Sequence, residues 1–285
     1  MNEERLLLTG GSGFLGSRLA LLAAAAGGRI WATHLHNPVP ESPGVTPIRL
    51  DLTSHVELTR LLEAVAPTVV IHTAYSMSDA VVNIESTSKL VAACVELPVQ
   101  PFFLFTSTDL IFDGSRGDYT EGDDPRPAIE YGRQKLAAEK IVHRAIPQAA
   151  IVRPSLIYDL HRLPRHLGFA VEAIGRGEPF TFFDDEYRCP VLADELAGVI
   201  LELCKRRQGG TWHTAGADRV DRWWFGVRLL AALGYPIDLA RRGRSADLPG
   251  ERPADCSLNG GKLRSTINMQ LSGAKKALAH IKVES

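Results

Sequence analysis

A tyrosine and a lysine four residues apart, Tyr131 and Lys135, are the pair of side chains with the most evident chemistry. Residues at i and i+4 share one face of a helix, so the phenol and the ammonium would be neighbours. A nearby cation favours the phenolate and lowers the pKa of a tyrosine from its reference value of about 10. Tyr131 could then donate or accept a proton near neutral pH. The same spacing occurs on ordinary exposed helices, so further features have to support this interpretation.

Hydroxyl side chains are the first such feature. Ser107 and Thr108 follow an aromatic strand that we expect over Phe102–Thr106, and Asp109 comes next. A hydroxyl at a strand end can hydrogen-bond a substrate carbonyl or the tyrosine; alternatively, it satisfies N–H groups of the loop. We favour the functional interpretation, because the glycine-rich turn described next is expected at the same edge of the sheet.

A glycine-rich turn lies near the start of the chain, in residues 6–16, LLLTGGSGFLG. Gly10 would allow a sharp turn after the strand, Gly13 would let the backbone approach a pyrophosphate, and Gly16 would let the helix pack on the strand. A helix over residues 17–26 would offer unpaired N–H groups and a partial positive charge to a phosphate. A purely structural turn is the alternative, but the order of strand, turn and helix favours a dinucleotide site.

Strands and helices alternate through the first half of the chain. After the first strand we expect strands over residues 29–33, 46–50, 68–72, 102–106 and 149–153, and helices over 54–65, 81–96 and 131–145, with Ser54 as an N-cap. This alternation predicts an α/β fold, a Rossmann-type doubly wound parallel sheet with helices on both faces.

The elements become shorter after residue 156. We expect helices over 194–205 and 223–233, a strand over 211–215, and a loop-rich tail over 241–261. The sequence therefore predicts an NAD(P)-binding Rossmann domain over residues 1–156. A smaller C-terminal substrate lobe would cover residues 157–285, with the segment 188–206 packing back on the Rossmann domain.

Composition excludes several classes of protein. The 285 residues carry a formal net charge of −1 with both signs mixed, which argues against a nucleic-acid partner. No apolar run approaches about 18 residues, so no membrane span is expected. The charged start Met1–Arg5 does not fit a signal peptide, and we expect a cytoplasmic protein. The four cysteines are scattered, so neither a metal site nor a disulfide framework is expected: Cys94, Cys189, Cys204 and Cys256.

The end of the second strand bears on the choice of cofactor. An acid there would bind the ribose diol of NAD, but residues 32–37 read ATHLHN. Without a carboxylate a 2′-phosphate is not repelled, and His34 and Asn37 could hydrogen-bond it. Alternatively, these are ordinary loop residues. We expect NADP(H) to be preferred over NAD(H).

Five segments carry a family resemblance: residues 9–16 (TGGSGFLG), 107–114 (STDLIFDG), 131–135 (YGRQK), 153–155 (RPS) and 252–258 (RPADCSL). The chain resembles extended short-chain dehydrogenases/reductases. Within these it is similar to the dTDP-4-dehydrorhamnose reductase (RmlD-like) family, to which the second and last segments point. The resemblance implies Thr108 as the catalytic hydroxyl, with Ser107 as a fallback. It implies Tyr131 as general acid, and Lys135 as the residue that holds the nicotinamide ribose and tunes the tyrosine.

The resemblance also implies a set of cofactor contacts. Asp51 and Leu52 would face the adenine, or Asp51 would instead cap a helix, and Thr73–Tyr75 would line the ribose and pyrophosphate. The expected cofactor-binding residues are Gly10, Ser12, Gly13, Phe14, Leu15, His34, Asp51, Leu52, Thr73, Ala74, Tyr75, Tyr131, Lys135 and Pro154.

Substrate candidates come mainly from the second lobe. Arginine binds diphosphate oxygens bidentately, and a tryptophan can stack on a base or a sugar. The candidates are Ser107, Asp109, Arg188, Arg222, Trp223 and Arg252. Alternatively, Arg188 pairs with Asp184 or Glu186, and the tryptophan belongs to the core. The basic stretch 161–176 does not match the family pattern.

The function expected from the resemblance is NADP(H)-dependent reduction of a keto group on a nucleotide-linked sugar. Such proteins commonly form homodimers through helices that flank the sheet. One alternative is a sugar-nucleotide epimerase or dehydratase on the same scaffold, and another is a non-catalytic NADP-binding regulatory subunit. The complete set of Thr108, Tyr131 and Lys135 favours catalysis.

Overall fold

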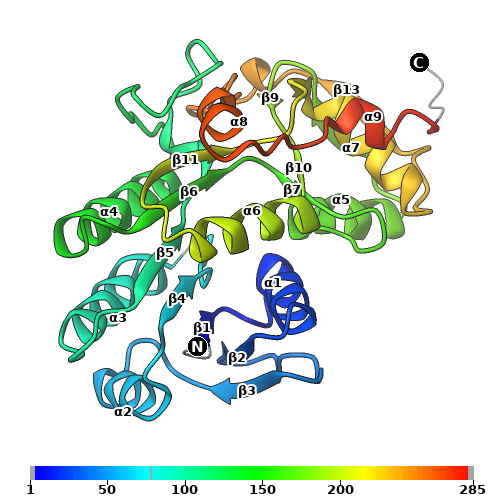
Figure 1. The fold of residues 1–285 in the computed structure, drawn as a ribbon. Coiled ribbons are helices and arrows are strands. Elements are labelled where there is room, and N and C mark those ends of the chain that lie inside the picture. The colour runs from blue at the N-terminus through cyan, green and yellow to red at the C-terminus, as the bar shows by residue number, and fades with distance from the viewer. Residues whose placement is uncertain (1–3, 78, 282–285) are drawn as a thin grey trace. The chain divides into compact units, whose positions relative to one another are not determined.

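The computed structural model describes residues 4–77 and 79–281, so residues 1–3 of the charged start lie outside it (Figure 1). The chain forms two compact units, each assembled from separate segments. The first unit contains the chain up to Thr108, Glu130–Arg153 and Ala197–Trp212, and the second contains Asp109–Ile129, Pro154–Leu196 and the chain from His213. A single boundary at residue 156, as expected from the sequence, would make each unit one continuous segment, whereas each unit contains three separate segments.

A sheet of seven strands runs through the described residues: β1 (Arg5–Thr9), β2 (Arg29–His34), β3 (Val45–Arg49), β4 (Val69–His72), β5 (Phe102–Thr106), β6 (Ala150–Pro154) and β11 (Gly210–Thr214). Their spatial order is β11-β6-β5-β4-β1-β2-β3, and all pairs from β3 to β6 are parallel. The order reverses at β1, which lies between β2 and β4. Ligands of open α/β sheets bind at such a switch point, beyond the carboxyl ends of the strands. The predicted Rossmann-type doubly wound sheet is confirmed.

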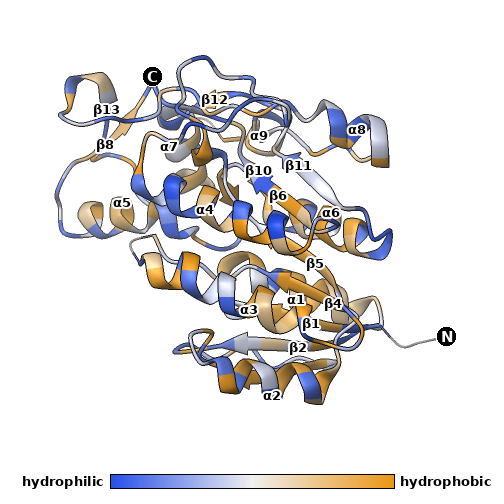
Figure 2. Ribbon diagram, turned by 90° about the vertical axis from the view of Figure 1, so that its left-hand side faces the viewer, coloured by the Kyte–Doolittle hydropathy of each residue, from blue (hydrophilic) through white to orange (hydrophobic). Residues whose placement is uncertain are grey.

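Four helices pack on the sheet in the first unit: α1 (Phe14–Ala25), α2 (His55–Val65), α3 (Ser86–Val95) and α4 (Glu130–Ala145). Figure 1 shows α2, α3 and α4 along one face and α1 on the other. The sheet face towards α2–α4 contributes buried apolar side chains such as Leu7, Val70 and Phe103, which pack with Leu58 and Val142 of the helices. Apolar colouring is accordingly concentrated on the central strands in Figure 2.

Two helices of the first unit differ from expectation. Helix α1 begins at Phe14, directly after the glycine turn, rather than at Ser17. The helix expected over residues 81–96 begins as a π-helix, Val81–Glu85, before α3. Such π-helical turns often occur at functional sites.

The second unit has its own core. It contains α5 (Arg165–Gly175), α7 (Arg222–Ala232), α8 (Gly261–Ile267), α9 (Ala274–Ala277) and the strand pairs β7 (Ile157–Tyr158) with β10 (Val191–Leu192), β9 (Tyr187–Arg188) with β12 (Val220–Asp221), and β8 (Phe180–Phe183) with β13 (Ala240–Gly243). Helix α6 (Ala193–Lys205) begins in this unit and ends in the first. Phe182, Phe225 and Leu230 are among the buried apolar side chains in the core of the second unit.

The expected loop-rich tail over residues 241–261 is wrong at its start, because residues 240–243 form strand β13 beside β8. The sequence ARRG has no alternation that would indicate a strand, and only the pairing with a distant segment orders it.

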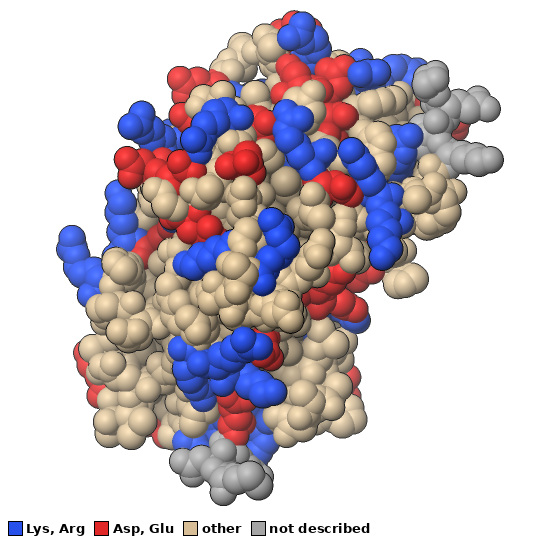
Figure 3. Space-filling view, turned by 45° about the horizontal axis from the view of Figure 1, so that its top comes forward, with Lys and Arg blue, Asp and Glu red and all other residues tan. Residues whose placement is uncertain are grey.

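Charged side chains of both signs are interspersed on the face shown in Figure 3. No helix within the described part of the chain is long and apolar enough to span a bilayer. The four cysteines are buried as free thiols, and residues 4–77 and 79–281 hold no group of three or more His, Cys, Asp or Glu suited to a metal ion.

Candidate functional site

The glycine-rich turn is compact because Gly10, Gly11 and Gly16 each lie where a Cβ atom would clash with a neighbour. Gly10 has a φ of +73°, and a Cβ there would lie 2.7 Å from the backbone nitrogen of Ala74. A Cβ at Gly16 would overlap the carbonyl oxygen of Gly10, so Gly16 packs against the turn rather than against the strand as expected. Gly13 is the N-cap of α1 and has no side chain to cap it, so Ser12, Phe14 and Leu15 surround an N-terminus suited to an anion.

The segment that follows β4 is fixed against this turn. Thr73 donates from its hydroxyl to the carbonyl of Thr9 at 2.7 Å, which brings Ala74 against Gly10. Tyr75 is 42% exposed, and its ring meets the ring of Tyr131 edge-on with centroids 6.2 Å apart. The glycine turn, Thr73–Tyr75 and the tyrosine of α4 therefore belong to one region of the first unit.

Lys135 is buried at the end of β5. Its ammonium donates to the carbonyl of Thr106 at 2.5 Å and lies 4.1 Å from the centre of the Phe105 ring. Burial lowers the pKa of Lys135 to about 7, although the carboxylate of Glu139 favours the charged form. Because Tyr131 lies four residues earlier on α4, the two side chains share the face of the helix that Lys135 turns towards β5.

A buried ion pair joins α4 to strand β6. Arg153 of β6 donates to Glu139 through two nitrogens, at 3.1 and 2.7 Å, and both side chains are about 5% exposed. Two parallel charge-assisted bonds fix the orientation of a helix as well as its distance from the sheet. The pair therefore holds the helix that carries Tyr131 and Lys135.

The hydroxyl run after β5 is buried in the same place. Ser107 donates from its backbone to Val152 at 2.7 Å, and its side chain is 4% exposed. The hydroxyl oxygens of Thr106 and Ser107 are buried without a hydrogen-bond partner, and Thr108 is 7% exposed. A buried hydroxyl without a hydrogen-bond partner costs folding free energy. A polar ligand bound beside Lys135 would supply the missing partners, so these hydroxyls fit a ligand site.

A buried histidine lies beneath the glycine turn. Nδ1 of His72 is hydrogen-bonded to the hydroxyl of Thr9 at 2.6 Å, and Nε2 is hydrogen-bonded to the hydroxyl of Thr87 at 3.0 Å. The Thr87 hydroxyl gives its proton to the carbonyl of Asn83, so it must accept from Nε2 of His72, and Thr9 must donate to Nδ1. Burial lowers the pKa of His72 to about 3, and the charge of Lys135 adds to the effect.

Asn83, which sequence reasoning missed, connects the parts of this region. Its amide accepts from the backbone nitrogen of Ser76 at 3.0 Å and donates to the Ser76 carbonyl at 2.6 Å. It also donates at 2.8 Å to Gln134 of α4. The available sequence signal is an amide between apolar residues in the run VVNI, and the structure buries it in the π-helical turn Val81–Glu85.

The adenosine end of the expected site lies at β2 and β3. His34 is the last residue of β2, and its Nδ1 is buried without a hydrogen-bond partner. Asp51 accepts from the backbone and hydroxyl of Thr53 at 2.8 and 2.7 Å, which lowers its pKa, and Leu52 packs against the core. The glycine cradle and the unpartnered His34 nitrogen fit the phosphates and ribose of a dinucleotide. Pro154, the last residue of β6, is buried.

In the second unit, the expected substrate arginines are bound to acids. Arg252 donates to Glu186 at 2.7 Å, and Arg222 lies 3.5 Å from the other oxygen of the same carboxylate. Arg188 is 4% exposed and lies 3.6 Å from Asp109 rather than pairing with Asp184 or Glu186. Three guanidinium groups against two carboxylates leave a net positive charge in this cluster.

Asp109 and Arg188 occupy a buried network. Ser155 donates to Asp109 at 2.7 Å and accepts from the backbone nitrogen of Cys189 at 3.1 Å. Burial opposes the charge on Arg188, but Asp109 and other acids more than offset it and raise the pKa of Arg188. Trp223 is half-buried and packs against the apolar core of the second unit.

Two motifs that are distant in sequence lie side by side in the second unit. The segment after Thr108 meets the late segment 252–258: Asp255 donates from its backbone to Gly114 at 2.9 Å. Ser257 accepts from the backbone of Tyr119 at 3.0 Å and, through its hydroxyl, from the backbone of Asp118 at 2.8 Å. The late motif therefore holds the segment that follows the catalytic hydroxyl candidate.

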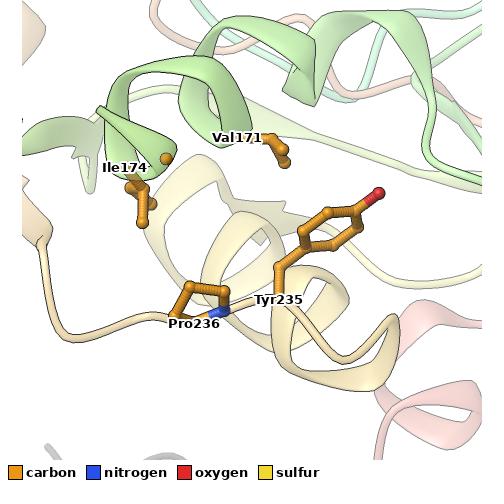
Figure 4. Close-up of a pocket in the computed structure, with 5 residues that line it drawn as sticks. Val171, Ile174, Tyr235 and Pro236 are labelled. Atoms are coloured by element: carbon orange, nitrogen blue, oxygen red, sulfur yellow. The ribbon is translucent and has the colours of Figure 1, made fainter. Parts of the chain in front are cut away.

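An apolar hollow of about 260 Å³ lies elsewhere in the second unit. Figure 4 shows Val171 and Ile174 of α5 facing Tyr235 and Pro236. Its five lining residues, which include Gly175, offer one hydroxyl and no charge. The hollow therefore lacks the groups that a phosphate or a reacting carbonyl needs.

The fold and the first unit's site define a class of protein. A glycine turn at the switch point of a doubly wound sheet, with a tyrosine and a buried lysine on one helix face, is the arrangement of an NAD(P)-dependent oxidoreductase of the extended short-chain dehydrogenase/reductase type. Residues 4–284 match the family model described as the RmlD substrate binding domain, and the chain belongs to this family.

Curated relatives of similar sequence are also reductases. The chain is 30% identical to the probable low-salt glycan biosynthesis reductase Agl14 of Haloferax volcanii, over 87% of this chain and 85% of that protein. It is 28% identical to the dTDP-4-dehydrorhamnose reductase of Mycobacterium tuberculosis, over 88% of this chain and 82% of that protein.

Solved structures share the fold. The dTDP-4-dehydrorhamnose reductase of Bacillus anthracis, in complex with NADP, superposes with a TM-score of 0.77 at 20% identity, covering 98% of each chain. MoeE5 in complex with UDP-glucose and NAD superposes with a TM-score of 0.81 at 21% identity, covering 97% of this chain and 96% of that chain.

Proposed function

We propose that this protein is an NADP(H)-dependent reductase that converts a keto group of a nucleotide-linked sugar to an alcohol. The observation that carries the proposal is the buried ammonium of Lys135, held at the end of β5 on the helix face of Tyr131 and beside unpartnered hydroxyls. A proton donor and hydrogen-bonding hydroxyls at this edge of the sheet would meet a dinucleotide held by the glycine turn, and this supports the proposal.

The chain's own residues have distinct roles in this mechanism. A reduced nicotinamide, when bound, supplies the hydride. The hydroxyl of Thr108, or of Ser107, donates a hydrogen bond to the carbonyl oxygen and stabilises the negative charge that develops on it. Tyr131 donates its phenolic proton to that oxygen. The charge of Lys135 favours the phenolate that remains, and Lys135 holds the cofactor ribose.

The second unit supports an anionic substrate. Arg222 and Arg252 have side chains that are 25% and 41% exposed, and Glu186 orients both guanidinium groups. We propose that these two bind the diphosphate and that Trp223 contacts the base or sugar. Arg188 and Asp109 are too buried for direct contact, so we assign them to holding the segment after Thr108.

The preference for NADP(H) is supported by the absence of a carboxylate at the end of β2 and by the buried, unpartnered nitrogen of His34. A 2′-phosphate would meet no like charge there, and His34 could bind it. A homodimer and a cytoplasmic location stay predictions.

Replacement of the proposed acid tests the function. The Tyr131→Phe variant should bind NADPH as the wild type does, by fluorescence titration, and should lose at least about a hundredfold in turnover of dTDP-4-dehydrorhamnose, as expected for loss of a general acid. Tyr235→Phe, at the apolar hollow, is the matched control and should keep full activity. Unchanged turnover in Tyr131→Phe would refute the mechanism. Tight NADPH binding without turnover of any keto-sugar in the wild type would instead favour a regulatory subunit.

A further inference from the structure

We infer that Arg49 selects a 2′-phosphorylated cofactor by binding its 2′-phosphate. This inference rests on the proposed function, because it requires a nicotinamide dinucleotide in the first unit. The sequence pattern did not single out this residue. Arg49 is 15 positions from His34 along the chain, and only the pairing of β2 with β3 brings the two together.

The sheet register places Arg49 at the right edge. β2 and β3 are parallel, and His34 pairs directly with Arg49 as the last residue of each strand. Paired residues of neighbouring strands project from the same face of a sheet. The guanidinium therefore extends from the carboxyl edge beside His34, whose Nδ1 is buried without a hydrogen-bond partner.

The guanidinium of Arg49 is available for a ligand. Its side chain is exposed, and no hydrogen bond or ion pair engages it within residues 4–77 and 79–281. The nearest acid in sequence, Asp51, uses one oxygen to accept from both the backbone and the hydroxyl of Thr53. That carboxylate stabilises its own turn, and the charge of Arg49 helps to lower the pKa of Asp51, although no ion pair joins the two side chains.

Charge and geometry then favour a phosphate over a diol. Residues 32–37 at the end of β2 contain no acid that would accept hydrogen bonds from the free ribose diol of NAD(H). Arginine presents a planar fork that binds two phosphate oxygens at once. Arg49 and the unpartnered nitrogen of His34 together supply donors for a dianion at this position.

The test measures binding of fragments that differ only in the 2′-phosphate. In the wild type, adenosine 2′,5′-bisphosphate should bind more tightly than adenosine 5′-monophosphate by isothermal titration calorimetry. Arg49→Gln should weaken the bisphosphate by about 10- to 100-fold, as expected for the loss of a hydrogen-bonded charge, and should change the monophosphate by less than about twofold. NADPH and NADH should follow the same pattern in fluorescence titrations.

A matched control and a reciprocal variant keep the test sharp. Arg60→Gln removes an exposed arginine of α2 and should leave all four affinities unchanged. His34→Asp should lower affinity for the bisphosphate and raise affinity for NADH, because a carboxylate repels the phosphate and accepts from the diol. The circular dichroism spectrum of each variant should match that of the wild type, which checks that the variant is folded.

The outcomes separate this inference from the proposed function. If Arg49→Gln weakens both adenosine fragments equally, or neither, Arg49 is not the selecting residue, while reductase activity with Tyr131 as acid stands. A wild-type protein that binds NADH as tightly as NADPH overturns both the inference and the proposed preference for NADP(H), while keto-sugar reduction with Tyr131 as acid stands. If the wild type binds neither dinucleotide, both the inference and the proposed function fail.

Discussion

Acidification should destabilise the protein, and the buried ring of His72 should carry a measurable share of the loss. In the folded state His72 bridges the hydroxyls of Thr9 and Thr87 as a neutral ring, and burial lowers its pKa from 6.5 to about 3. In the unfolded chain the ring titrates at its ordinary value. Between about pH 6.5 and pH 3 the unfolded state therefore binds more protons than the folded state, and the free energy of unfolding rises with pH.

The size of the effect follows from the two pKa values. Each pH unit below 6.5 removes about 1.4 kcal/mol, so lowering the pH from 8 to 5 should remove about 2 kcal/mol through His72 alone. The folded pKa is far enough below 5 that this figure depends only on the unfolded value.

The assay compares urea unfolding at pH 8 and pH 5 in the wild type and in His72→Gln. The variant should be less stable at pH 8, because the amide satisfies the two threonines less well, but it should lose about 2 kcal/mol less between the two pH values. His55→Gln, at the exposed start of α2, is the control and should keep the wild-type pH dependence.

An equal loss in the wild type and in His72→Gln would refute the reasoning. A second measurement does not depend on the variant's folding. The imidazole Cε1–H resonance of His72 in the wild-type protein should not shift between pH 8 and pH 4.5, and a shift over that range would contradict a neutral buried ring.

Two further predictions concern cofactor binding. Because burial lowers the pKa of Lys135 to about 7, its ammonium is lost as the pH rises, so affinity for NADPH should fall by up to about tenfold from pH 6 to pH 8. Lys135→Met should remove this dependence, and Lys140→Met on the exposed side of α4 should retain it; a pH-independent wild-type affinity would contradict the assignment. Gly16→Ala should abolish NADPH binding in titrations, because its Cβ would overlap a carbonyl of the glycine turn. Gly168→Ala, where a Cβ meets nothing within 4 Å, should bind NADPH normally, and normal binding by Gly16→Ala would show that the turn can relax.

The sequence by itself determined the fold class and the local parts of the site. Gly10, Gly13 and Gly16 indicated the turn, and the spacing of Tyr131 and Lys135 indicated a shared helix face, because short-range periodicity and steric limits act within a few residues. The alternation of strands and helices indicated the parallel sheet for the same reason.

Only the tertiary structure decided how distant residues meet. It showed Lys135 buried against the end of β5, Asn83 clamped between Ser76 and α4, and Arg49 beside His34. It also paired Arg188 with Asp109 rather than with the nearer Asp184 or Glu186, and it joined the segment after Thr108 to residues 252–258. No local pattern encodes these contacts, because strand register and the burial of polar groups depend on elements separated by tens of residues along the chain.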